Sequence, residues 1–175
     1  MDKQVDNLKK YLSTIIICLV LATFFVAVQW GISSGFISGY WVTNLYLVGI
    51  NIILAASLNL INGFTGEFSL GHAGFMAVGA YSSAVITANL GLPFPLAVIV
   101  GMLAAALTGL LVGLPTLRLR GDYLGIATLG FGEIVRVVLM NIDYVGGASG
   151  LMGIPALVNW PIIFFSVVLS LLLIR

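Results

Sequence analysis

The feature that most constrains this chain is a long stretch without charge. From Tyr11 to Gly66 the sequence contains no Asp, Glu, Lys or Arg. A charged side chain at the centre of a bilayer costs about 2.5–3.5 kcal/mol on insertion scales, so long charge-free apolar stretches are typical of membrane-spanning helices. Over the whole chain 61% of the residues are hydrophobic and 7% are charged, against roughly 25% charged residues in soluble domains. This composition excludes a soluble globular protein.

The spanning elements are predicted to be helices. In lipid each backbone N–H and C=O must find an internal partner, so a spanning segment is either a helix or a barrel strand. The apolar runs are about 20 residues long, the length that a helix needs to cross roughly 30 Å of hydrocarbon. They also lack the alternation of barrel strands. We therefore expect an all-α polytopic transmembrane helix bundle, with a single domain over residues 1–175. The six predicted spans cover residues 12–30, 41–61, 73–90, 94–114, 123–142 and 157–174.

The basic residues predict the orientation of these spans. Lys and Arg near the ends of spans stay on the cytoplasmic side of a membrane. The lysines at positions 3, 9 and 10, the pair Arg118 and Arg120, and Arg175 all fall on one side if each of the six segments crosses. The N-terminus is therefore expected in the cytoplasm. Because the sequence stops at Arg175 directly after an apolar run, we also expect further spans to follow in a longer protein.

The first polar cluster is a glycine-rich segment, residues 62–75, between the second and third predicted spans. Glycine permits unusual backbone angles and close approach of another segment. Ser69 is a candidate cap for the following helix, whose free N–H groups would face an anion such as a substrate carboxylate. Broken helices of this kind form binding sites in transporters, and the alternative is a solvated cytoplasmic turn. Since the sequence has a single His, we predict no metal site. The candidate translocation or gating residues are Gly66, Glu67, Ser69, Gly71, His72 and Gly74.

The second polar cluster covers residues 117–136 and includes the fifth predicted span. At helical spacing Gly121, Gly125, Thr128, Gly132 and Arg136 fall along one face. Glu133 is placed to pair with Arg136 at i,i+3, which lowers the cost of holding both charges in a membrane. Two interpretations stay open, a structural ion pair or a cytoplasmic docking surface that leads into a moving helix. The candidate docking residues are Arg118, Arg120, Gly121, Asp122, Tyr123, Glu133 and Arg136.

Three stretches of the sequence resemble a known family. Residues 66–81 read GEFSLGHAGFMAVGAY, which is similar to the G-[QE]-x-S-L-G-H-A-x-F-x-x-x-G-A-Y signature of LivM-type permeases. Residues 114–136, LPTLRLRGDYLGIATLGFGEIVR, resemble the second signature of the same family, and residues 146–155, GGASGLMGIP, resemble its glycine-rich outer loop. These permeases are inner-membrane subunits of ATP-binding-cassette importers for branched-chain amino acids.

The resemblance implies a transport subunit that is not itself an enzyme. In keeping with this, the sequence contains no G-x-x-x-x-G-K-[ST] phosphate-binding loop, and ATP would be bound on partner subunits. The implied partners are a companion LivH-type permease, two cytoplasmic ATP-binding subunits and an extracytoplasmic amino-acid binding protein, in the cytoplasmic membrane of a bacterium or archaeon. No nucleic-acid partner is expected. The segment from Arg118 to Tyr123 is predicted to contact the ATPases, with Glu133 and Arg136 as its inner support.

Two other functions remain alternatives at this stage. Related permeases that carry urea or short amides share much of the same pattern. A stand-alone secondary transporter would instead use an intramembrane carboxylate, Glu67 or Glu133, to carry coupling protons.

Overall fold

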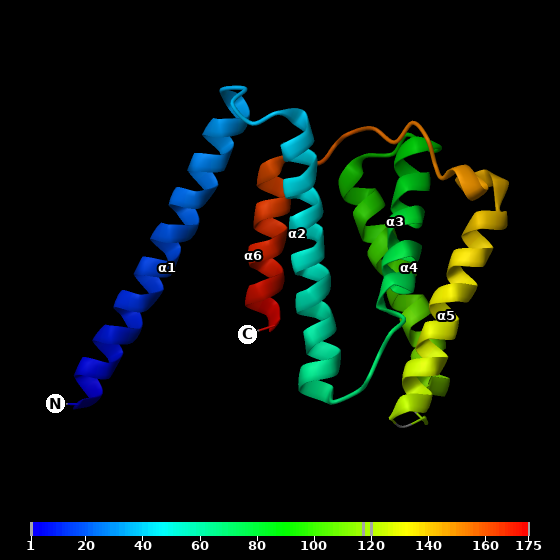
Figure 1. Ribbon diagram of the computed structural model, residues 1–175, viewed down its shortest axis with the longest axis horizontal. Helices are drawn as coiled ribbons and strands as arrows, with labels where there is room; N and C mark the ends of the chain where they lie inside the picture. Colours follow the sequence, from blue (N-terminus) through cyan, green and yellow to red (C-terminus); the bar gives the residue numbers. More distant parts are fainter. Residues whose placement is uncertain (1, 117, 120, 175) are drawn as a thin grey trace. The chain divides into compact units, whose positions relative to one another are not determined.

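The computed structural model describes the chain apart from residues 1, 117, 120 and 175, and apart from the side chains of residues 2–11, 13 and 14. Within that part of the chain all regular structure is helical, which confirms the all-α prediction (Figure 1). The six α-helices are α1 (Asp2–Ser33), α2 (Gly39–Asn59), α3 (His72–Ala88), α4 (Phe94–Thr116), α5 (Asp122–Asn141) and α6 (Trp160–Ile174).

Four of the helical stretches are long and apolar enough to cross a membrane. They are Ile15–Ser33, Gly39–Thr65, Phe94–Thr116 and Asp122–Asn141. The remaining two helices are shorter, with 17 residues in α3 and 15 in α6. Helix α5 is continuous through Glu133 and Arg136, and its 20 residues correspond to about 30 Å at 1.5 Å per residue.

The end of α2 differs from the predicted end of the second span at residue 61. The helix continues as a π-helical turn, Leu60–Thr65, and stops at Gly66, whose φ of 69° lies in the left-handed region. Glycine adopts this conformation without the steric cost that a Cβ atom would bring. The irregular part of the glycine-rich segment is therefore shorter than predicted and extends from Gly66 to Gly71.

The helices form two compact units. The first is made of Met1–Ile53 with Val158–Leu173, and the second is mainly Leu54–Leu157. In the first unit aromatic and small residues join the helices. The ring of Phe25 on α1 lies 5.0 Å from that of Phe164 on α6, and Gly49 on α2 leaves room for Ile163 of α6 to contact its backbone.

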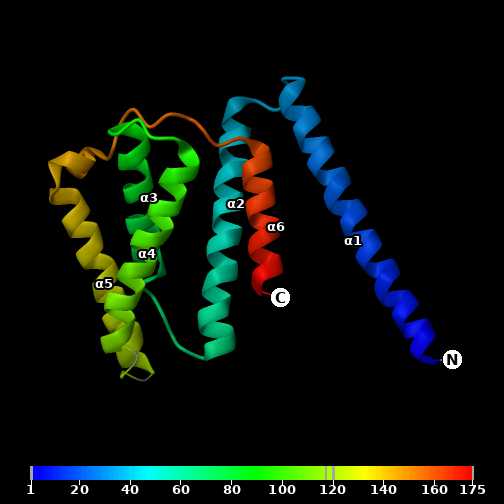
Figure 2. The same ribbon diagram turned by 180° about the vertical axis from the view of Figure 1, so that it is seen from behind.

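In the second unit α3 packs most extensively against α4, and α5 lies against α3, as Figures 1 and 2 show from opposite sides. Small residues permit the α3–α4 contact. A Cβ atom at Gly101 of α4 would lie 2.7 Å from the carbonyl oxygen of Gly79 on α3 and 3.1 Å from the Cβ atom of Ser83. Close approach of this kind is the usual basis of helix association in lipid, where the hydrophobic effect does not drive it.

The connection after α5 completes the second unit. Two short 3-10 turns, Asp143–Val145 and Gly147–Ser149, follow α5, and the second of them packs back against α5. From Gly150 the chain has no helix until Trp160. The last helix thus starts three residues later than the predicted sixth span, and the turns end beside α3 and α5.

Candidate functional site

The two polar clusters that the sequence presents separately are in contact in the structure. The backbone N–H of Leu70 donates a hydrogen bond of 3.0 Å to the hydroxyl oxygen of Thr128 on α5. That hydroxyl in turn donates to the carbonyl oxygen of Gly125, also at 3.0 Å, and Thr128 is only 5% exposed. Irregular backbone within a membrane must have its polar groups paired by protein or by cavity water. Thr128 supplies one such pairing and so fixes the glycine-rich segment on α5.

Glycines bring the two elements to backbone distance. A Cβ atom at Gly71 would contact the carbonyl oxygen of Thr128 and lie 2.9 Å from its carbonyl carbon. A Cβ atom at Gly74 would lie 3.1 Å from the Cα atom of Gly132. Because the φ angle of Gly71 is −89°, this glycine is explained by close approach and not by an unusual backbone angle.

The face of small residues that the sequence predicts on α5 is present over most of the helix. Gly125 and Thr128 are buried, and a Cβ atom at Gly125 would lie 2.7 Å from the ring of Phe68. Gly132 faces Gly71, whose Cα atom would be 3.8 Å from an added Cβ atom. Gly121 does not share this face, because it precedes the helix with a φ of 59° and acts as its N-terminal boundary.

Ser69 does not have its predicted role. The N-cap of α3 is Gly71, without a side-chain capping bond, so the expectation that Ser69 caps this helix is wrong. Ser69 is buried at 8% exposure, and its N–H donates to the side-chain oxygen of Asn62 at 3.3 Å. The bonds from Ser69 to Asn62 and from Leu70 to Thr128 pair the two N–H groups that precede Gly71. Within the same segment Glu67 is half-buried and Gly66 is exposed.

His72 is joined to the end of α2. Its Nε2 atom lies 2.7 Å from the hydroxyl oxygen of Ser57, while its Nδ1 atom is buried and finds no hydrogen-bond partner in the described part of the chain. Sequence reasoning did not single out Ser57, which sits within an apolar run and has no neighbouring polar pattern. The Ser57–His72 contact links the two sides of the glycine-rich segment.

Glu133 and Arg136 form the predicted ion pair. The Nε atom of Arg136 lies 3.0 Å from the Oε2 atom of Glu133, and the two side chains are 63% and 59% exposed, Arg136 first. Along α5 the pair begins 11 residues after Asp122 (133 − 122) and ends five before Asn141 (141 − 136). At 1.5 Å per residue Glu133 is about 16 Å from the start of the helix. The pair therefore lies away from the N-terminal end of α5, and Arg136 is about 8 Å from the C-terminal end.

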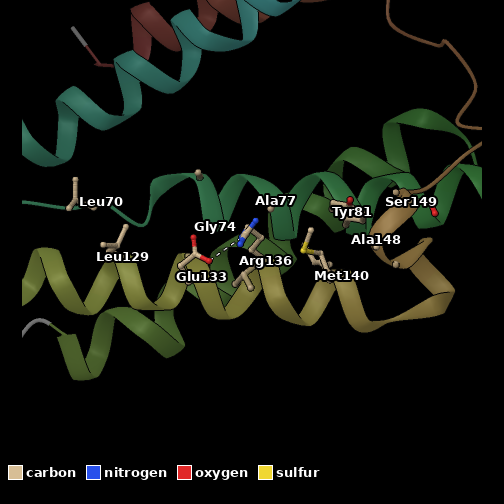
Figure 3. Close-up of a pocket in the computed structure, with 16 residues that line it drawn as sticks. Leu70, Gly74, Ala77, Tyr81, Leu129, Glu133, Arg136, Met140, Ala148 and Ser149 are labelled. Carbon is tan, nitrogen blue, oxygen red and sulfur yellow. Dashed lines mark hydrogen bonds and ion pairs between the residues drawn. The ribbon is translucent and has the colours of Figure 1, made fainter.

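The ion pair opens into a cavity of about 550 Å³ (Figure 3). The cavity lies between α3, α5 and the Gly147–Ser149 turn, and Figure 3 shows Glu133 and Arg136 on the side of α5 that faces α3. The remaining walls are mostly small or apolar. They include Gly74, Ala77, Leu129, Gly132, Leu139 and Met140.

The predicted docking segment forms the turn between α4 and α5. Arg118 is exposed, and its N–H donates to the carbonyl oxygen of Pro115 at 3.4 Å. Asp122 is the first residue of α5, and Tyr123 next to it is 74% exposed. Arg120 lies outside the described residues. The structure thus separates the candidates into a surface group at the turn and the distant pair Glu133 and Arg136.

Comparison with known proteins identifies the family. Residues 40–174 match the family described as branched-chain amino acid transport system, permease component. Two relatives, each named high-affinity branched-chain amino acid transport system permease protein LivM, come from Escherichia coli K12 and Salmonella typhimurium LT2. Each is 42% identical over 139 residues, which cover 78% of this chain and 32% of the relative. The chain thus spans about a third of the length of these relatives.

No solved structure matches the chain. The family match nevertheless includes the glycine-rich segment and the whole of α5, which the hydrogen bond from Leu70 to Thr128 joins. The chain is a multi-pass membrane protein and belongs to the family of permease components of branched-chain amino acid transport systems.

Proposed function

We propose that this chain is part of the membrane-spanning subunit of an ATP-binding-cassette importer for branched-chain amino acids, in the cytoplasmic membrane of a bacterium or archaeon. The match of residues 40–174 to the permease family is the observation that carries this proposal. The names of the two LivM relatives point to the same substrates. Their 42% identity extends over most of this chain.

Energy would come from separate subunits. The permease would assemble with a companion LivH-type permease, two cytoplasmic subunits that bind and hydrolyse ATP, and an extracytoplasmic amino-acid binding protein. The sequence supports this division of labour because it contains no G-x-x-x-x-G-K-[ST] loop for phosphate. In this proposal the permease supplies the pathway and the moving helices, and it performs no chemistry of its own.

The turn before α5 is the proposed contact with the ATPases. It exposes a cationic side chain, Arg118, and an aromatic one, Tyr123, and Arg and Tyr are enriched among residues that dominate interfaces. The turn continues directly into α5, which holds the glycine-rich segment through Thr128. A displacement of the turn would therefore move α5 as a rigid element and shift the segment packed against it.

The geometry favours an ATP-driven importer over a proton-coupled transporter. A carboxylate that carries coupling protons must be free to take up and release a proton during each cycle, whereas the Oε2 atom of Glu133 accepts a hydrogen bond from Nε of Arg136. Glu67, the other candidate proton carrier, lies half-buried beside the left-handed Gly66 at the edge of the segment.

The test is transport by the reconstituted complex. The full-length permease that carries this sequence is placed in vesicles with its companion permease, ATPases and binding protein, and uptake of labelled leucine is measured with and without ATP. We expect uptake to require ATP and to be reduced by isoleucine and valine but not by urea or acetamide. Leucine uptake driven by a proton gradient without the ATPases would contradict the proposal.

A further inference from the structure

The ion pair on α5 keeps unused hydrogen-bonding groups that face the cavity. Within the described residues the pair makes a single bond, from Nε of Arg136 to Oε2 of Glu133. A guanidinium carries five N–H donors in a fixed fork, so the two terminal nitrogens of Arg136 remain available. The Oε1 atom of Glu133 is also without a partner among those residues. The terminal N–H groups of the Arg136 guanidinium and the Oε1 atom of the Glu133 carboxylate therefore lie side by side, each able to bind a ligand.

The position of these groups makes a purely structural role expensive. Ionisable side chains inside membrane helices are rare and normally face a bundle interior or a water-filled cavity, where they mark substrate pathways. Glu133 and Arg136 lie in the C-terminal half of α5 and are more than half exposed. Both line the cavity between α5 and α3.

The rest of the cavity suits an aliphatic group. Ala77 and Gly132 leave space because their side chains are small or absent, and Leu129 and Met140 add apolar surface. Small-molecule sites are typically apolar cavities of roughly 300–1,000 Å³ with a few polar groups that fix orientation. A volume of about 550 Å³ lies in that range.

We propose that this cavity binds an aliphatic α-amino acid as its zwitterion. Arg136 would receive the α-carboxylate through its two terminal nitrogens, because a guanidinium matches a carboxylate with two parallel hydrogen bonds. The carboxylate of Glu133 would accept a hydrogen bond from the α-ammonium. The aliphatic side chain of the bound amino acid would lie against Leu129 and Met140. The inference rests on the proposed function, since it places the transported amino acid at a defined point on α5. It also explains how the permease would distinguish amino acids from urea and amides, because urea and amides carry neither of the two charges that the pair would recognise.

Protection of a cysteine in the cavity tests this site. In a background with Cys18 replaced by Ala, Ala77→Cys places a thiol on the cavity wall, and Asn89→Cys at the end of α3 is the control. The complete complex in nanodiscs, without binding protein, is treated with a thiol reagent and increasing leucine. We expect leucine to slow labelling at position 77 but not at 89. The analogues 4-methylpentanoate and 3-methylbutylamine, which lack the ammonium and the carboxylate respectively, should protect poorly.

Variants of the pair complete the experiment. Glu133→Gln and Arg136→Lys should each raise the leucine concentration for half-protection by about tenfold or more, as expected for a lost hydrogen bond to a charged group. Tyr144→Phe, at an exposed residue that does not line the cavity, should leave it unchanged, and basal ATPase activity reports that each variant assembles. Equal protection in all variants would overturn the site. So would a thiol at position 77 that stays unreactive without leucine, because another protein segment then fills the cavity. ATP-driven leucine uptake by the unaltered complex, measured in parallel, separates these failures from a failure of the proposed function.

Discussion

Replacing Gly71 by Ala should destabilise the second unit by a defined amount. The added Cβ atom would meet backbone atoms of Thr128, including the carbonyl carbon at 2.9 Å. Backbone atoms of a helix cannot rotate away as a flexible side chain does, so the glycine-rich segment must move off α5. Overpacking of this kind typically costs about 1–3 kcal/mol. Since 1.4 kcal/mol is a factor of ten, the unfolding equilibrium constant should rise roughly 5- to 150-fold.

The matched control is Gly130→Ala on the adjacent face of α5. Apart from the backbone of α5 itself, no atom of the described residues lies within 4 Å of a Cβ atom added there, and Ala is favoured over Gly in a helix by about 0.8–1 kcal/mol. Both variants are unfolded by SDS in mixed micelles and followed by circular dichroism. Gly71→Ala should unfold at lower SDS than wild type, and Gly130→Ala at the same or higher SDS. Identical midpoints for the two variants would refute the close contact at Gly71.

Three further predictions concern other contacts. Thr128→Val leaves the N–H of Leu70 unpaired and should cost about 1–3 kcal/mol in the same unfolding assay, while Thr128→Ser keeps the hydroxyl and should be milder. Ser57→Ala removes the hydrogen bond to the imidazole and should cost about 0.5–1.5 kcal/mol there; an unchanged midpoint would contradict that bond. Arg118→Cys with Cys18→Ala should react with an impermeant thiol reagent in inside-out vesicles and not in intact cells, and labelling of intact cells would contradict the topology.

The helices themselves were predictable because their signal is local. Each apolar run is long, lacks internal charges and is bounded by glycine, proline or polar residues, and lipid leaves helix as the available conformation for such a run. The i,i+3 pair on α5 was predictable for the same reason, since helical geometry alone brings residues 133 and 136 together. Errors at the ends, such as the π-helical turn after α2, arise where the chain leaves the regular pattern.

The contact between the glycine-rich segment and α5 could not be read from local pattern. Leu70 and Thr128 are separated by 58 positions, and no periodicity connects them. Local rules also misassigned Ser69, because its own N–H pairs with the side chain of Asn62 and the next N–H pairs with the distant Thr128 hydroxyl, contacts that no local pattern indicates. One signal was present, since Gly125, Thr128 and Gly132 at helical spacing indicate a face that another backbone approaches closely. The partner of that face required the structure.

A single helix joins the proposed ATPase contact to the proposed amino-acid site, which predicts opposite phenotypes at its two ends. Tyr123 and Arg136 are 13 positions apart on α5 (136 − 123), or about 20 Å at 1.5 Å per residue, so neither side chain acts directly on the other. Tyr123→Ala should lower substrate-stimulated ATP hydrolysis by the complex, because truncating an aromatic anchor often costs 2 kcal/mol or more at an interface, and it should leave leucine protection at position 77 intact.

Arg136→Lys should have the opposite effects on protection and on ATP hydrolysis, with hydrolysis measured at saturating leucine. It weakens protection by leucine and preserves maximal ATP hydrolysis, since the contact at the turn is unaltered. Both quantities are measured on the same preparations, with Tyr144→Phe as the common control. The expected separation depends on α5 moving as one rigid body, with binding and coupling at different points along it. If Tyr123→Ala weakened leucine protection as strongly as Arg136→Lys does, the two ends would not be separate sites, and the division of labour along α5 would have to be abandoned.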